Sequence, residues 1–147
     1  MSANGHGPPT GPGDEWTFVV DDNTPQLLAR VRRWTATALA DLGDDHLNDV
    51  MLILVELVSN AYEHGGGCRS VRLARSRTPC RIDVEVDDNN ADQLTPGVSR
   101  FGTKANRGRG LIMIDKIAES WGVRNADGVG KTVWAHISCE NATPCPA

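Results

Sequence analysis

Apolar and polar residues change their period along the chain, and each change predicts a different element. Residues 16–20 are rich in β-branched and aromatic side chains and predict a strand, which the turn-forming residues 21–23 close. A helix follows, with Thr24 as its cap and Pro25 at its first position. The apolar stripe of this helix consists of Leu27, Val31, Trp34, Ala38 and Leu42.

A second helix is predicted to begin near Asp44 and to end at the glycine cluster 65–67. One side of it is polar and includes Glu56 and Asn60. The opposite side is a wide apolar face that consists of Leu47, Val50, Met51, Leu54, Leu57, Val58, Ala61 and Tyr62.

Glu56 and Asn60 are four residues apart, which places one above the other on the same helix face. Leu52 and Ile53 flank Glu56 there, although a helix side that faces solvent more often carries charge, so we expect this side to line a cavity. A carboxylate base and a carboxamide ligand one turn apart could hold a hydrated Mg²⁺ ion and activate a hydroxyl. The alternative is an ordinary wet helix face, on which such pairs are common.

The rest of the chain predicts two strands, a long loop, a third helix and two final strands. The long loop lacks periodicity and would be either a functional lid or a disordered segment. This order of elements predicts an α/β (α+β) two-layer sandwich, with three helices on one face of a mixed, mostly antiparallel sheet. In chain order the ranges are 70–74, 81–86, 88–108, 110–121, 121–124 and 132–138.

The length of 147 residues favours one domain. We expect a disordered leader at residues 1–14, a folded domain at 15–139 and a flexible tail at 140–147. The net charge of −4 gives no basic face for direct binding of nucleic acid. No apolar run approaches the roughly 20 residues of a membrane span, and no signal peptide is evident, so a cytoplasmic protein without a membrane partner is expected.

The four cysteines form no C-x-x-C pair, which argues against a zinc site and suits reduced thiols. Residues 128–132 are similar to part of a P-loop, but the required first glycine is Asn125 and a strand follows, so we reject that motif. His64 is interpreted as a partner of the helix C-terminus. A Ser-His-Asp triad stays open, although no G-x-S-x-G elbow is present.

Two further positions carry candidate chemistry. Asp88 ends a strand at the start of the long loop and could accept a hydrogen bond from a purine amino group, or could simply serve a turn. Gly108-Arg109-Gly110 precedes a helix, whose free N–H groups attract phosphate, and Lys104 and Arg107 would add positive charge. The alternative there is a glycine hinge in a solvated basic loop.

In this order the motifs resemble the GHKL-type ATPases, most closely the bacterial anti-sigma-factor serine/threonine kinases. The resemblance covers roughly residues 16–138. The segment 56–61 is similar to the N-box of that family, and Asp88 falls where the adenine-binding aspartate belongs. Residues 108–111 are similar to the second glycine box, and residues 130–133 to the closing G-x-T-type strand.

The resemblance implies a Bergerat-type fold, often as a homodimer, that uses ATP and Mg²⁺. Such proteins sequester a sigma factor and phosphorylate a STAS-type anti-anti-sigma antagonist. Glu56 would be the general base, Asn60 would ligate Mg²⁺, and Arg30 would contact a partner. The residues expected to contact adenine or to form the phosphate-binding lid are Asp88, Lys104, Gly108, Arg109, Gly110, Leu111 and Thr132.

One departure favours a competing function. The first glycine box of the family usually reads Asp-x-Gly-x-Gly or Asp-Gly-Ser, whereas here Asn89, Asn90 and Ala91 follow Asp88. Asparagine tolerates the left-handed conformation that glycine would adopt. The alternatives are therefore a regulatory binding protein without kinase activity and, less in keeping with the sequence, the catalytic domain of a sensor histidine kinase. That domain needs a phosphoacceptor helix pair, which nothing upstream of Trp16 supplies.

Overall fold

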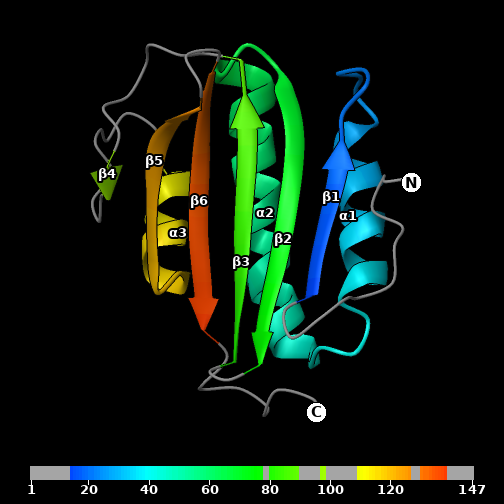
Figure 1. The fold of residues 1–147 in the computed structure, drawn as a ribbon, viewed down its shortest axis with the longest axis vertical. Coiled ribbons are helices and arrows are strands. Elements are labelled where there is room, and N and C mark those ends of the chain that lie inside the picture. The colour runs from blue at the N-terminus through cyan, green and yellow to red at the C-terminus, as the bar shows by residue number, and fades with distance from the viewer. Residues whose placement is uncertain (1–13, 78–79, 90–96, 99–108, 127–129, 139–147) are drawn as a thin grey trace.

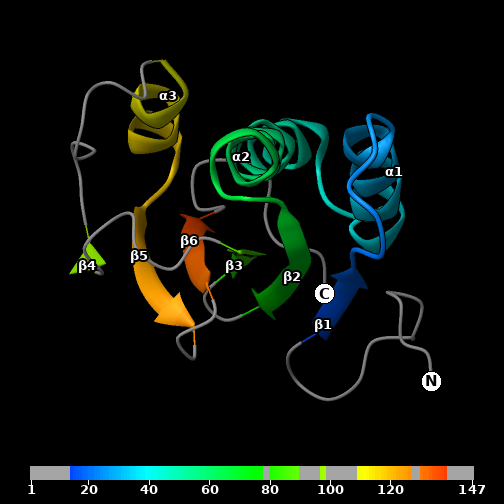
Figure 2. The same ribbon diagram turned by 90° about the horizontal axis from the view of Figure 1, so that it is seen from above.

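The structure is a computed structural model, and it describes residues 14–77, 80–89, 97–98, 109–126 and 130–138. In these residues the strands form a six-stranded sheet in the order β1-β2-β3-β6-β5-β4, and every neighbouring pair is antiparallel. The three described helices cover one face of the sheet and leave the other open (Figures 1 and 2). The elements are β1 (Asp14–Val19), α1 (Leu27–Ala38), α2 (Asp44–His64), β2 (Cys68–Arg77), β3 (Cys80–Asp88), β4 (Gly97–Val98), α3 (Arg109–Ile117), β5 (Ser120–Ala126) and β6 (Gly130–Ser138).

The predicted two-layer sandwich is confirmed, with the sheet entirely antiparallel where it is described. Its core lies between α2 and the central strands (Figure 2). Burying one such aliphatic side chain contributes about 1.5–3 kcal/mol, so this layer supplies much of the stability of the fold. The fully buried side chains include Val50, Ile53 and Leu54 of α2, Val71 and Leu73 of β2, Ile82 and Val84 of β3, and Ile137 of β6.

Helix α1 begins at Leu27, two residues later than the predicted start at Pro25. Gln26 is the residue before the helix and makes no side-chain cap bond, and the amide of Leu27 donates to the carbonyl of Thr24 in a turn. Asn23 explains the delay. Its side chain accepts from the Cys68 amide at 2.9 Å and donates to the Cys68 carbonyl at 3.1 Å, so this segment is tied to the start of β2.

Helix α2 has the predicted bounds, but its apolar arc is rotated from the expected one. Ile53 is fully buried, because it lies three residues after Val50 and four before Leu57 on the core stripe. Tyr62, expected in the apolar face, is 39% exposed, and Leu52 is 47% exposed. The polar side of α2 is therefore flanked by one exposed leucine, and Ile53 belongs to the core.

Helix α3 ends at Ile117, four residues before the predicted end. Trp121 belongs to β5, where it is buried and its indole N–H donates to Asp115 at 2.9 Å. Trp121 comes four residues after Ile117, so its position also fits the apolar stripe of the predicted helix. Helix α3 and strand β5 both bury apolar residues in the same core. The short strand β4 was not predicted, since two residues carry no recognisable period.

The expectation that all cysteines are reduced is wrong for Cys80, which is disulfide-bonded. Cys68 is a free thiol, and burial raises its pKa to about 12. None of the described helices is long and apolar enough to cross a bilayer. The predicted leader and tail lie almost wholly outside the described residues.

Candidate functional site

The polar side of α2 presents Glu56 and Asn60 as predicted, one turn apart and both half-buried. Within the described residues neither side chain has a hydrogen-bond or ion-pair partner. No group of three or more described His, Cys, Asp and Glu residues could by itself hold a metal ion. A hard cation at Asn60 would thus take most of its ligands from phosphate and water, as Mg²⁺ usually does.

A glycine turn ends α2 and directs the chain into β2. The amides of Gly65 and Gly67 both donate to the carbonyl of Ala61, at 3.1 and 3.0 Å. Gly66 and Gly67 have φ angles of 73° and 110°, which L-residues with side chains rarely adopt. The glycine cluster is therefore required by the backbone of this turn.

Asn89 fastens this turn to the end of β3. Its backbone amide donates to the carbonyls of Gly65 and Gly67, at 3.0 and 3.2 Å. Its side-chain amide donates to the carbonyl of Gly66 at 3.1 Å. The asparagine that stands in the first glycine box thus has a structural role that glycine could fill only in part, because glycine has no side-chain donor.

Asp88 lies directly below the end of α2 and is 2% exposed. A Cβ atom at Gly65 would come within 2.4 Å of its Oδ2 atom. Lys131 of β6 pairs with the same carboxylate. The Lys131 Nζ lies 2.6 Å from Asp88 Oδ2, and the Lys131 backbone amide donates to Oδ1 at 3.3 Å.

Sequence reasoning missed Lys131 as a site residue. The signal was the alternation in β6, where Ala135 and Ile137 are buried and position 131 has the same parity. That parity places Lys131 on the helix-covered face, where a lysine needs an acidic partner. Asp88 shares that face with Val84 and Val86, so the two charged residues meet inside the sandwich.

Thr132 has the opposite parity and points away from Asp88. Its hydroxyl donates to Asp87 Oδ1 at 2.5 Å, on the open face of the sheet. Burial by itself would raise the pKa of Asp87, but hydrogen bonds from Arg72, Ser70 and Thr132 outweigh burial and lower it. The contact of Thr132 with adenine stays a prediction, and the structure brings its hydroxyl to Asp87 instead.

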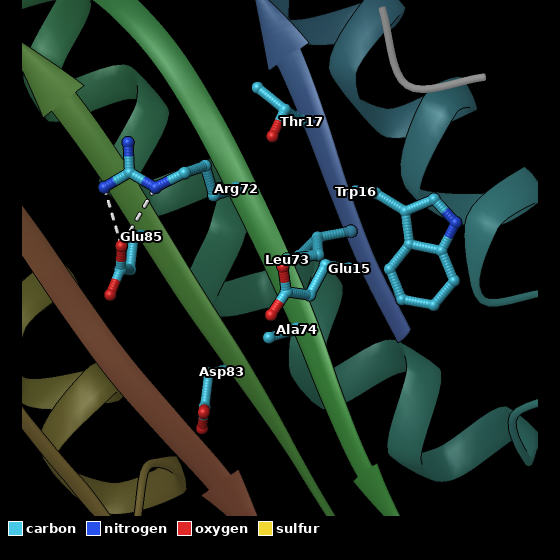
Figure 3. A pocket seen from close by; sticks show the side chains of 8 residues that line it. All are labelled: Glu15, Trp16, Thr17, Arg72, Leu73, Ala74, Asp83 and Glu85. Carbon is cyan, nitrogen blue, oxygen red and sulfur yellow. Dashed lines mark hydrogen bonds and ion pairs between the residues drawn. The ribbon is translucent and has the colours of Figure 1, made fainter. Parts of the chain in front are cut away.

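Arg72 links acidic residues across the open face. Its guanidinium lies 2.6 Å from Glu85 and also contacts Asp87, and Arg124 reaches Glu85 from β5 at 2.9 Å. Figure 3 shows Arg72 directed at Glu85, at one side of a hollow formed by β1, β2 and β3. The hollow is lined by Glu15, Trp16, Thr17, Arg72, Leu73, Ala74, Asp83 and Glu85.

Ser120, His136 and Asp83 form a row on the same open face. Ser120 Oγ lies 3.4 Å from His136 Nδ1, and His136 Nε2 lies 3.7 Å from Asp83 Oδ1. Both distances exceed the roughly 2.6–3.2 Å of an activated nucleophile. Asp83 is also paired with Arg81 at 2.8 Å. This row is a set of cross-strand contacts and not a catalytic triad.

The lid residues are described only in part. Arg109, Gly110 and Leu111 form the first turn of α3, as the predicted phosphate-binding helix start requires, but their side chains lie outside the described part. Lys104 and Gly108 also lie outside it. Figure 1 shows that β3 ends and β6 begins at the end of the sheet where α2 also ends.

Arg30 lies off the core stripe of α1, as predicted, and is partly exposed. Its guanidinium carbon is 5.3 Å from the centre of the Phe18 ring, in a cation–π contact with β1. Phe18 in turn packs edge-to-face against Trp34 at 5.4 Å. The arginine is therefore held in place on the outside of α1, and its contact with a partner stays a prediction.

Comparison with known proteins agrees with this arrangement. No curated protein matches the chain. The family model of the histidine kinase-like ATPase domain matches residues 22–137, which include α2, the glycine turn, Asp88 and all but the last residue of β6. The match covers most of the chain and implies ATP as the ligand. The chain belongs to the family of histidine kinase-like ATPase domains.

Proposed function

We propose that this ATPase domain is a cytoplasmic, ATP-dependent protein serine/threonine kinase of the anti-sigma-factor type. It would sequester a sigma factor and phosphorylate a serine or threonine of a STAS-type antagonist. The observation that carries the proposal is the pair Glu56 and Asn60, half-buried on one side of α2 and without a described partner. A general base and a metal ligand on the same helix face are the groups that phosphoryl transfer needs, since that reaction depends mostly on positioning and charge stabilisation.

Each residue of this site would have a separate task. Glu56 would accept the proton of the attacking hydroxyl, and Asp88 would anchor the base of the nucleotide. Asn60 fits Mg²⁺ because a carboxamide oxygen is a hard ligand of the kind that this ion prefers. The bound ion would neutralise charge on the phosphate groups. Backbone N–H groups at the start of α3 would contact phosphate oxygens.

The partner contacts are proposed for the outside of the helix layer. Arg30 is held over Phe18 and remains partly exposed, so its charge is available to an acidic partner surface. A homodimer is proposed from the resemblance to the anti-sigma kinases. Substitution Arg30→Ala should weaken partner binding but leave ATP binding unchanged, whereas Arg32→Ala, at an exposed neighbouring position, is the matched control.

The test begins with ATP titration in Mg²⁺ and in EDTA, followed by transfer of labelled phosphate to an antagonist that copurifies from the native cell. Asn60→Ala should abolish the Mg²⁺-dependent part of the ATP affinity, while Ser59→Ala, on a different side of α2, should not. ATP binding without transfer to any copurified antagonist would contradict the kinase proposal. Copurification that yields no sigma factor would contradict the anti-sigma assignment.

A second candidate is a regulatory binding protein without kinase activity. It is favoured by Asn89, which departs from the expected first glycine box and whose side chain bonds to the glycine turn. The same titration discriminates between the two. A binding protein would show partner affinity that is independent of Glu56, and phosphate transfer would stay at the background level in the unmodified chain.

A further inference from the structure

We infer that Lys131 acts together with Asp88 as one base-reading unit, which recognises the adenine amino group and a ring nitrogen next to it. The inference rests on the proposed ATP-binding function and adds a residue to it. A carboxylate alone can only accept hydrogen bonds. With Lys131 beside it, the same place in the fold presents an acceptor and a charged donor.

The spacing of the two groups fits this task. Lys131 Nζ and Asp88 Oδ2 are 2.6 Å apart, so that donor and acceptor lie side by side. A side-chain carboxamide likewise carries an oxygen acceptor and an N–H donor next to each other, and it reads adenine through two parallel hydrogen bonds. Adenine offers the complementary pattern, because its amino group donates and each flanking ring nitrogen accepts.

The burial of the pair favours joint recognition over displacement of the lysine. The side chains of Lys131 and Asp88 are 8% and 3% exposed. A ligand that used Asp88 alone and expelled the ammonium would break a buried ion pair, which is costly because it leaves an uncompensated charge. A ligand that bonds to both groups keeps the pair intact and gains a charge-assisted hydrogen bond from Lys131.

The pair is also fixed in position from two sides. A Cβ atom at Gly65 would meet Asp88 Oδ2 at 2.4 Å, and one at Gly130 would meet the Asp88 carbonyl oxygen at 1.8 Å. The Lys131 backbone amide holds the second carboxylate oxygen. Asp88 therefore has little freedom to turn away from Lys131, and an incoming base meets the two groups as a preorganised unit.

The test compares three nucleotides on the unmodified chain by calorimetry in Mg²⁺: ATP, 1-deaza-ATP and 7-deaza-ATP. Each deaza analogue lacks one of the two ring acceptors that flank the amino group. We expect one of the analogues to bind about 10- to 100-fold more weakly than ATP, the range for loss of a hydrogen bond to a charged group. Equal affinities for all three would overturn the inference. Failure of the chain to bind ATP at all would instead refute the proposed function.

Variants then assign the effect to the lysine. In Lys131→Met the ratio of ATP to deaza-ATP affinity should fall to about one, whereas Lys116→Met, an exposed lysine of α3, should keep the ratio of the unmodified chain. Tighter ATP binding by Lys131→Met would overturn the inference, because the ammonium would then compete with the base.

Lys131→Arg keeps a charged donor and serves as a second variant if the methionine variant does not fold. Unlike the methionine variant, it should keep part of the discrimination, and complete loss in a folded Lys131→Arg chain would count against recognition by a donor at this position.

Discussion

The backbone of Gly130 lies so close to Asp88 that a Cβ atom at position 130 would be 1.8 Å from the Asp88 carbonyl oxygen. This contact brings the start of β6 against the end of β3, just before the ladder begins at Thr132 and Asp87. It also sets the direction from which Lys131 approaches the carboxylate. The glycine is therefore required by packing between two backbones.

Substitution Gly130→Ala should destabilise the fold by about 3 kcal/mol or more, because neither backbone can yield without disturbing the ladder. Urea unfolding measures the effect. Gly43→Ser is a control that should raise the free energy of unfolding. Residue 43 precedes α2 in an extended conformation and makes no side-chain cap bond. A serine cap there should add a few tenths of a kcal/mol. An alanine at 130 with unchanged stability would show that the two strands are not in this contact.

Glu56→Gln should lower the rate of phosphate transfer by about 10²- to 10⁴-fold, the usual contribution of a general base, and should leave the ATP dissociation constant unchanged. Single-turnover transfer and equilibrium titration measure the two quantities separately. Glu63→Gln is the matched control, because Glu63 lies seven residues further along α2 and its side chain is 63% exposed. If the Glu56 variant transfers phosphate as fast as the unmodified chain, Glu56 is not the general base.

His46 should make the stability depend on pH near neutrality. It is 2% exposed and its Nε2 has no partner among the described residues. Burial lowers its pKa from 6.5, as does Arg75 to a smaller degree, while a backbone hydrogen bond with Ile137 and the charge of Asp49 act in the opposite direction. The folded chain thus binds a proton less readily than the unfolded chain.

The free energy of unfolding should therefore be constant above about pH 7.5 and should decrease as the pH falls through about 6.5, where the unfolded state takes up the proton. In His46→Gln this decrease should disappear between about pH 8 and 5.5. Below that range the hydrogen-bonded carboxylates, whose pKa values are lowered, add their own acid sensitivity. A slope that persists in the glutamine variant would assign the titration to another group.

Asp41 and Arg75 should show strong coupling in a double-mutant cycle. The Arg75 side chain is 1% exposed and meets Asp41 at 2.7 Å, and this hydrogen bond lowers the pKa of Asp41. Asp41→Ala should cost about 2–3 kcal/mol, because it leaves the guanidinium charge buried without its carboxylate. Arg75→Met removes that charge, so the double variant should be more stable than the sum of the single effects predicts. Additive effects would show that the pair does not interact.

The sequence predicted those elements whose bounds follow from a local hydrophobic period. It failed where contacts between residues far apart in the sequence determine the structure. The bounds of α2 followed from its apolar spacing and its glycines, and β3 and β6 from alternation. The start of α1 depends on the bond between Asn23 and Cys68, 45 residues apart, which no local pattern contains. Trp121 has the same apolar character whether it ends a helix or begins a strand.

The same distinction applies to the site. Glu56 and Asn60 could be paired by counting along one helix. The partnership of Asp88 with Lys131 required the register of β3 against β6, and parity alone would have placed Lys131, not Thr132, on the face of Asp88. The role of Asn89 depends on the conformation of the glycine turn, which its own residue type does not reveal.

The hydrogen bonds of Asn89 have a mechanical consequence. They tie the glycine turn that follows α2 to the end of β3, and so limit any shift of the helix that carries Glu56 and Asn60 relative to Asp88. Under the proposed function, the general base Glu56 and the adenine anchor Asp88 would therefore keep a fixed separation when a nucleotide binds. Weakening these hydrogen bonds at position 89 would then change the position of Glu56 and Asn60 relative to Asp88.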